Sequence, residues 1–151
     1  MHSEGNRNYI GLMKSNIVFE YPLTIRESHL DTFGHVNNAV YLSLFEEARW
    51  EFITARRYGL EKIRQTQQGP VILAIELSFK HELRLRDQIM IRTQLDKYEG
   101  KTGVVKQWMT NQNGELCCEA SFTMGFFDLK ARKLIRPTPE WLYAIGIESS
   151  T

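Results

Sequence analysis

The sequence predicts an α+β fold in which an antiparallel sheet wraps around one long helix. Two segments, 71–79 and 89–96, carry apolar residues at every second position, the period of a strand. Asn113-Gly114 lies between two further strand-like segments and is a strong β-hairpin signal. A helix over Ala39 to about Arg57 is predicted by the spacing of its apolar residues, which are Tyr41, Leu44, Phe45, Ala48 and Phe52.

The segment before the helix is expected to contain a loose arm and one strand. Residues 1–14 are polar and contain Asn and Gly, so we expect an arm there, followed by a single domain over residues 15–151. The stretch from Ile17 to Arg26 is rich in β-forming residues. Pro22 cannot donate to a neighbouring strand, which favours an edge position or a bulge.

The segment after the helix is expected to be mostly β structure. A short helical turn is predicted over Glu61 to Arg64, before the first of four strands. These strands are expected over 71–79, 89–96, 104–110 and 116–126, with a turn over 128–133. Thr138-Pro139 combines an N-cap with proline at the first helical position, and so predicts a short helix ending near Ile145.

Length, charge and cysteine content limit the classes of function. The 151 residues, 42% of them hydrophobic, suffice for one domain with a core. A net charge of +1 does not suggest nucleic acid or an anionic membrane as a partner. No apolar run has the length of a membrane span or the character of a signal peptide, so we expect a soluble cytoplasmic protein. Cys117 and Cys118 are adjacent, point to opposite sides of a strand and suit neither a disulfide nor a metal site.

The stretch Asp31-Thr32-Phe33-Gly34-His35-Val36-Asn37-Asn38 directly precedes the long helix. The first amides of a helix lack partners within it and carry partial positive charge, so they suit a carbonyl oxygen that develops negative charge. A carboxylate seven residues upstream can serve as a base or nucleophile. This layout is typical of a hydrolytic site.

Together with Tyr41 and Phe45-Glu46-Glu47-Ala48-Arg49, this motif resembles that of the hotdog-fold acyl-CoA thioesterases of the 4-hydroxybenzoyl-CoA thioesterase type. The resemblance extends from about Phe19 to Pro137, although its later part is only a pattern of strands. It implies hydrolysis of CoA thioesters without a metal or cofactor, in a homodimer or homotetramer. It also implies that Asp31 is the catalytic residue and that the oxyanion-binding amide lies near Asn38.

Each residue of the motif also has a structural interpretation. Asp31 to Gly34 fits a type I turn, which favours Asp at its first position and Gly at its fourth. His35 can orient Asp31, touch substrate or stabilise the turn, and Asn37 and Asn38 are good capping residues. We place all of these, with Tyr41, on the oxyanion and substrate side of the site.

Charged residues elsewhere give weaker assignments. Glu46, Glu47 and Arg49 lie inside the helix, where ion pairing or an interface is the first interpretation, with Glu47 as a reserve catalytic candidate. Two basic clusters can bind the phosphates of CoA or be ordinary solvated loops. They are Lys80, His81, Arg84 and Arg86, and separately Lys130, Arg132 and Lys133.

Two rival functions remain open on the same fold: a 2-enoyl thioester hydratase, since His35 lies four residues from Asp31, and a non-catalytic acyl-CoA or acyl-carrier binding protein. The sequence leaves open the acyl chain, the carrier, the choice between an anhydride and a general-base route, and the choice between dimer and tetramer.

Overall fold

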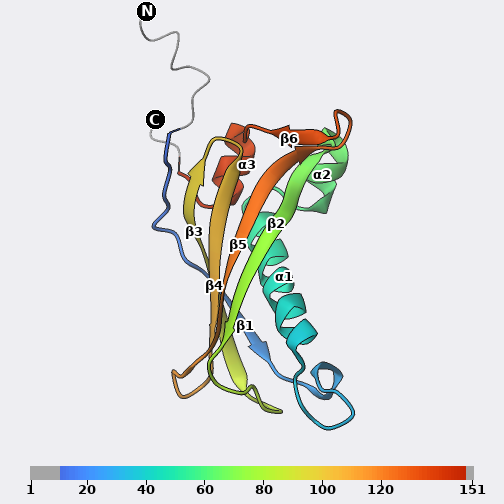
Figure 1. The fold of residues 1–151 in the computed structure, drawn as a ribbon, viewed down its shortest axis with the longest axis vertical. Coiled ribbons are helices and arrows are strands. Elements are labelled where there is room, and N and C mark those ends of the chain that lie inside the picture. Colours follow the sequence, from blue (N-terminus) through green and yellow to red (C-terminus); the bar gives the residue numbers. More distant parts are fainter. Residues whose placement is uncertain (1–10, 149–151) are drawn as a thin grey trace, which may run out of the picture.

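The computed structural model describes residues 11–148 and has the expected architecture, with a curved antiparallel sheet against one long helix (Figure 1). The elements in chain order are β1 (Phe19–Thr24), η2 (Glu27–His29), α1 (Asn38–Ala55), α2 (Leu60–Thr66), β2 (Gln68–Phe79), β3 (Gln88–Glu99), β4 (Thr102–Thr110), β5 (Leu116–Asp128), β6 (Lys133–Ile135) and α3 (Pro139–Ala144).

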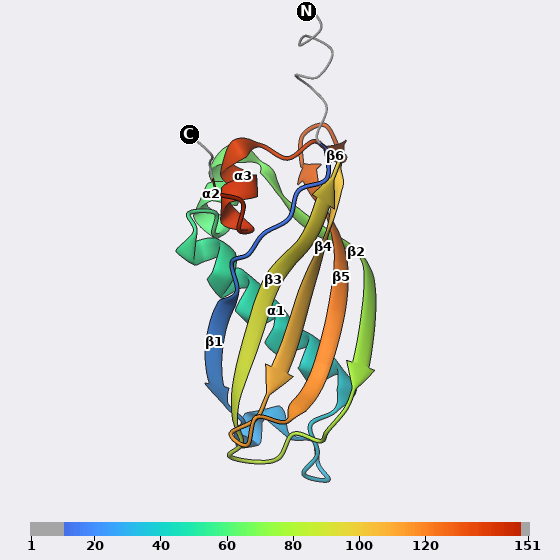
Figure 2. The ribbon, with the colours of Figure 1, turned by 90° about the vertical axis from the view of Figure 1, so that its left-hand side faces the viewer.

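The sheet has the order β1-β3-β4-β5-β2, with the short β6 paired to β5. All of its pairs are antiparallel. Pro22 lies in β1 at one edge of the sheet, as its missing donor requires. The other edge is β2, whose outward side has no strand partner among residues 11–148. Figure 2 shows α1 crossing the concave face of the sheet.

The core lies between α1 and this face. The buried residues of α1 are Tyr41, Leu44, Phe45, Ala48, Phe52 and Ile53. The first four pack with alternate residues of the strands, among them Ile91 of β3, Met109 of β4 and Phe122 of β5. Beyond Ile53, a second cluster joins α1 to α3 through Tyr58, Phe126 and Trp141. The apolar residues that recur every three or four positions in the helix therefore pack against the apolar residues that recur at every second position in the strands.

Several sequence-based boundaries need correction. The long helix covers 38–55 instead of 39–57, the first strand covers 19–24 instead of 17–26, and the turn at 61–64 is the helix α2. The sequence did not predict β6. Of the expected N-terminal arm, residues 1–10 lie outside the described residues, whereas Met13 pairs with Tyr98 through two backbone hydrogen bonds of 2.9 Å.

The strict alternation expected over 71–79 is wrong. A register shift between Ile72 and Ala74 places Leu73 in a bulge. Ile72 and Ile75 therefore pair with Met124 and Phe122, both buried, although they are three residues apart in β2. A bulge reverses the facing of every later residue on its strand, and the sequence pattern gave no sign of it.

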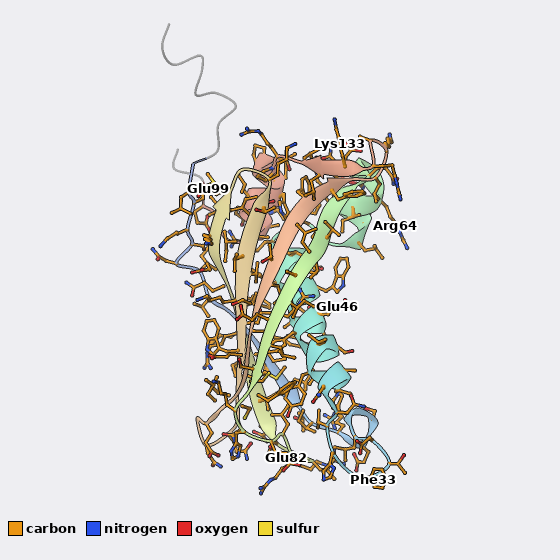
Figure 3. All side chains as sticks on the ribbon, viewed as in Figure 1. Phe33, Glu46, Arg64, Glu82, Glu99 and Lys133 are labelled. Carbon is orange, nitrogen blue, oxygen red and sulfur yellow. The ribbon has the colours of Figure 1, made fainter. Side chains whose placement is uncertain are left out.

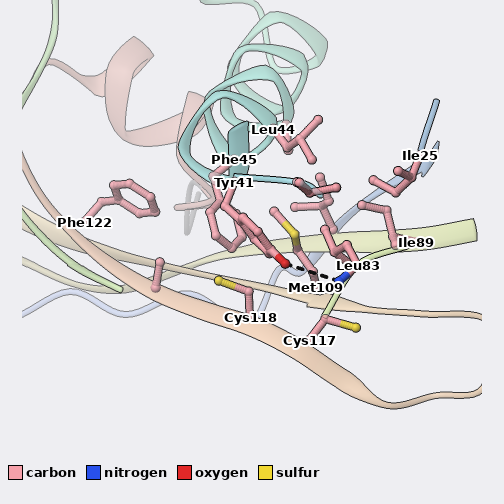
Figure 4. Packing of buried hydrophobic residues seen from close by; sticks show 14 residues of the cluster. Ile25, Tyr41, Leu44, Phe45, Leu83, Ile89, Met109, Cys117, Cys118 and Phe122 are labelled. Carbon is pink, nitrogen blue, oxygen red and sulfur yellow. Dashed lines mark hydrogen bonds between the residues drawn. The ribbon is translucent and has the colours of Figure 1, made fainter. Parts of the chain in front are cut away.

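The two cysteines also depart from a regular strand. Cys118 pairs with Met109, while the next register pair joins Leu116 to Thr110, so Cys117 is the extra residue. Both thiols are fully buried and free, and they point in different directions in Figure 4. Burial raises the pKa of both thiols, that of Cys118 to about 12. Both residues therefore belong to the core, the role expected of a buried cysteine.

Candidate active site

The loop before α1 is closed by Asp31. Its Oδ1 accepts hydrogen bonds from the backbone N–H groups of Phe33 and His35, at 2.9 and 3.0 Å. The Asp31 backbone bonds to His35 O and Gly34 N at 2.8 and 3.0 Å, and Gly34 has φ +79°, a left-handed conformation that favours glycine. The turn interpretation of these residues thus describes the loop, and it holds the carboxyl group at a fixed position. No described residue donates a hydrogen bond to Oδ2, so one carboxylate oxygen stays free for chemistry.

The cap of α1 leaves one amide free. Asn37 is the N-cap, and its Oδ1 accepts from the backbone N–H groups of Ala39 and Val40, at 2.9 and 3.3 Å. Within residues 11–148, the N–H of Asn38 bonds to no acceptor. The cap thus satisfies the amides after Asn38 and leaves its own N–H, at the positive end of the helix, available to an oxyanion.

The other residues assigned to this end differ in accessibility. The side chain of His35 is exposed and makes no hydrogen bond within the described range, and Phe33 beside it is 85% exposed. Tyr41 is only 4% exposed, and Figure 4 shows its hydroxyl accepting from the Leu83 backbone N–H, at 3.3 Å. Burial raises the pKa of this hydroxyl. Tyr41 therefore belongs to the hydrophobic core, in the same cluster as Val36 of the preceding loop.

Glu47 lies away from the loop. It is nine residues past Asn38, about 14 Å along the helix axis. Glu47 accepts a short hydrogen bond from the hydroxyl of Tyr21 in β1, and this bond raises the pKa of Tyr21 to about 12. Asp31 and Glu47 therefore do not form a carboxylate pair. The contact with Tyr21 is an interaction that the sequence reasoning did not identify.

The two basic clusters lie at opposite ends of the sheet. Figure 3 places Phe33 and Glu82 at one end and Lys133 and Arg64 at the other. Lys80, His81, Arg84 and Arg86 flank Glu82 in the β2–β3 loop, so they share the end of the Asp31 loop. Part of this charge is already paired, since Arg86 contacts Glu27 at 2.8 Å and Lys80 lies 3.8 Å from Glu119.

Sequence reasoning missed a polar cluster under α1. Arg49 points inward, and its Nη1 donates to Gln107 Oε1 at 2.9 Å. Gln107, 1% exposed, donates in turn to Phe45 O and Thr93 Oγ1. A signal was present, because Arg49 lies four residues after Phe45, on the apolar face of the predicted helix.

Residues 11–148 contain no group of three or more His, Cys, Asp or Glu side chains placed to hold a metal ion. None of the helices in this part of the chain combines the length and apolar character needed to cross a membrane.

Comparison with known proteins identifies the family. A profile of the thioesterase-like superfamily matches residues 25–145, a range that includes the Asp31 loop, α1 and the whole of β2 to β5. The chain belongs to this superfamily. It is accordingly an enzyme that hydrolyses thioesters, with the hotdog fold.

Individual relatives agree with this assignment. The long-chain acyl-CoA thioesterase FadM of Escherichia coli (strain K12) is 32% identical over 120 residues, which cover 75% of this chain and 86% of FadM. YbaW, a probable thioesterase from Escherichia coli, is similar in structure with a TM-score of 0.73 and 28% identity, covering 83% of this chain and 94% of that one. The protein SAV2348 from Staphylococcus aureus, solved in complex with CoA, has a TM-score of 0.80 at 17% identity, covering 88% and 84%, and supports the fold alone.

Proposed function

We propose that this chain is an acyl-CoA thioesterase in which Asp31 is the base or nucleophile and the Asn38 amide polarises the thioester carbonyl. The proposal depends on one observation: among the described residues, the same short loop holds the Asp31 carboxylate in place with one oxygen free, and leaves the Asn38 N–H at the start of the helix without an acceptor. The similarity to FadM, a long-chain acyl-CoA thioesterase, supports an acyl-CoA substrate.

The chemistry needs these two groups and water. In the general-base route, Asp31 removes a proton from water as its oxygen attacks the carbonyl carbon. The carbonyl oxygen becomes an anion that accepts a hydrogen bond from the Asn38 N–H. The C–S bond then breaks, and the leaving thiolate of CoA takes up the proton that Asp31 removed from water. In the nucleophilic route, an oxygen of Asp31 attacks the carbonyl carbon and the C–S bond breaks, which releases the CoA thiolate and leaves a mixed anhydride. Water then hydrolyses the anhydride and restores the Asp31 carboxylate. Either route gives a free acid and CoA.

Replacing Asp31 by Asn tests the role of the carboxylate. This change keeps the turn-forming side chain and removes the charge, so kcat should fall on the order of 10² to 10⁴-fold while substrate binding stays similar. Free thiol released from saturated acyl-CoA esters of varied length measures it. Asp128→Asn is a matched control, since Asp128 Oδ1 also closes a turn by accepting hydrogen bonds from the Lys130 and Ala131 N–H groups, at 2.9 Å each. Asp128 is the last residue of β5. A folded Asp31→Asn protein with unchanged turnover would contradict the proposal.

The same assay separates the rival functions. A 2-enoyl-CoA substrate that loses its conjugated chromophore without releasing thiol would identify a hydratase. That alternative has a single feature in its favour, the exposed imidazole of His35 near Asp31. Saturable binding of acyl-CoA without either reaction would identify a binding protein.

We further propose that the enzyme is an isologous dimer joined through β2, with the two sheets continuing across the contact. This edge has twelve residues and exposes Leu73, Ile75 and Phe79, each 47% accessible. A long apolar edge is normally covered in a native protein, and a twofold dimer is the commonest way to do so.

Light scattering of the intact chain at micromolar concentration should give the mass of a dimer or a pair of dimers. Ile75→Lys should weaken the assembly, whereas Val18→Lys, a control at an exposed position before the other edge strand, should not. A wild-type monomer would contradict the dimer.

A further inference from the structure

The inner face of α1 carries a cation with no anionic partner. Arg49 is partly buried, and its Cζ lies 4.2 Å from the centre of the Phe122 ring. Its hydrogen bond to Gln107 uses one of five guanidinium N–H donors, on a neutral acceptor. Within residues 11–148, no carboxylate lies at ion-pair distance from it.

Burial accordingly lowers the pKa of Arg49 to about 10, and nearby Glu46 only partly offsets this. The side chain is still charged at neutral pH. A desolvated charge is normally paired, so a cation left without a carboxylate indicates a role other than stability.

Arg49 lines a cavity of about 120 Å³ between α1 and the sheet. Apolar side chains form most of the wall, including Ile72, Val105 and Met124, while Thr93 belongs to the polar cluster beneath Arg49. Glu46 also lines the cavity, but it forms no ion pair with Arg49 among the described residues. Trp141 also lines the cavity and is fully buried. An apolar pocket with a few polar donors is the usual form of a binding site for a small organic group.

The position of the cavity fits the far end of an acyl chain. Arg49 is eleven residues past Asn38, so about 16 Å of helix separates it from the proposed thioester site. An extended carbon chain with bonds of about 1.5 Å advances roughly 1.25 Å per bond, so a chain of about a dozen bonds reaches from one to the other. β2 runs between these two points: Ile72 lines the cavity, and Phe79 packs edge-on against Tyr41, with ring centres 5.0 Å apart.

We propose that this cavity binds the remote end of the acyl group and that Arg49 selects acyl chains bearing an acceptor oxygen there, a carboxylate in preference to a hydroxyl. Arg49 is a specificity-determining residue in this assignment, which rests on the proposed function. A carboxylate would supply the missing counter-ion through charge-assisted hydrogen bonds, whereas a terminal methyl group would leave the guanidinium unpaired.

Binding of non-hydrolysable analogues tests the proposal without requiring turnover. The probes are S-alkyl thioethers of CoA with a saturated chain of about fourteen carbons, ending in methyl, hydroxyl or carboxylate. Quenching of tryptophan fluorescence follows binding, since Trp50 and Trp141 both line the cavity. We expect the carboxylate probe to bind wild-type protein at least about tenfold more tightly than the methyl probe, with the hydroxyl probe between them.

Arg49→Met keeps a long side chain but removes the charge, and it should bring the affinities of the carboxylate and methyl probes within about twofold. Arg49→Lys keeps the charge and should retain part of the preference, which guards against a fold defect in the Met variant. Arg56→Met is the matched control, because Arg56 is also next to α1 and lies over an aromatic ring but pairs with Glu148 outside the cavity.

Equal affinities of all three probes for wild-type protein would overturn the role of Arg49 while leaving the proposed function intact. So would a preference that Arg49→Met does not change. If no probe bound, the acyl-CoA substrate itself would be wrong, and this inference would fail with it.

Discussion

The two ends of α1 are held by different forces. At its N-terminus the Asp31 loop is largely exposed, and side-chain hydrogen bonds from Asp31 and Asn37 fix the backbone. At its C-terminus the chain is packed beneath α3, where Trp141 stacks on Phe126 with ring centres 5.3 Å apart and meets Tyr58 at 5.4 Å. Exposed polar groups provide chemistry, whereas tight packing provides rigidity. Substitutions at the first end should change turnover more than stability, and those at the second should mainly change stability.

The largest expected effect on stability is that of Trp141→Ala at the packed end. Trp141 is fully buried against Tyr58 and Phe126, so its truncation removes apolar contacts and leaves a cavity. The free energy of unfolding should fall by about 3 to 5 kcal/mol. Urea denaturation measures it. Phe33→Ala at the exposed end should change stability by less than about 0.5 kcal/mol. A similar loss in both variants would remove the contrast between the two ends.

The sequence predicted the local features of the fold and missed those that depend on residues far apart in the chain. Local patterns determined α1, the Asn113-Gly114 hairpin, whose Gly114 has φ +76°, and the α3 cap, where Thr138 accepts from Trp141 N–H at 3.3 Å. Each of these depends on residues close in sequence. The bulge at Leu73 and the strand β6 depend on pairing with β5, which no local pattern encodes.

The candidate site likewise has local features that the sequence predicted and long-range contacts that it did not. The turn closed by Asp31 and the helix cap at Asn37 depend on residues close in sequence, so the motif indicated both of them. The pairing of Tyr21 with Glu47 joins residues 26 apart, and that of Arg49 with Gln107 joins residues 58 apart. Both polar contacts exist only once β1 and β4 are packed against α1, so the sequence could not identify the partners, although the position of Arg49 on the apolar face of the helix indicated that this side chain points inward.

Removing the N-cap of α1 tests the difference between the two ends of the helix with a smaller expected loss of stability than that of Trp141→Ala. Asn37→Ala deletes the acceptor of the Ala39 and Val40 amides and should destabilise the protein by about 1 kcal/mol. The Asn38 amide then loses its fixed orientation, so kcat should fall more than KM rises. Thr138→Ala removes the equivalent cap of α3 and serves as the control. It should lower stability by a comparable amount while turnover of the folded protein stays near wild type.

The smallest expected effect concerns Glu47, between the two ends. Its carboxylate accepts from the Tyr21 hydroxyl and so favours the protonated phenol, which is why the pKa of Tyr21 is raised to about 12. In Glu47→Gln the negative charge is gone, and the pKa of Tyr21 should shift down toward the ordinary value of about 10. Ultraviolet titration of tyrosinate absorbance reports the shift, with Tyr21→Phe identifying the signal. Because Glu47 lies about 14 Å along the helix from Asn38, we expect turnover to fall less than about tenfold. A loss as large as that of Asp31→Asn, with the protein still folded, would instead make Glu47 the acid–base residue and place the chemistry in the middle of α1.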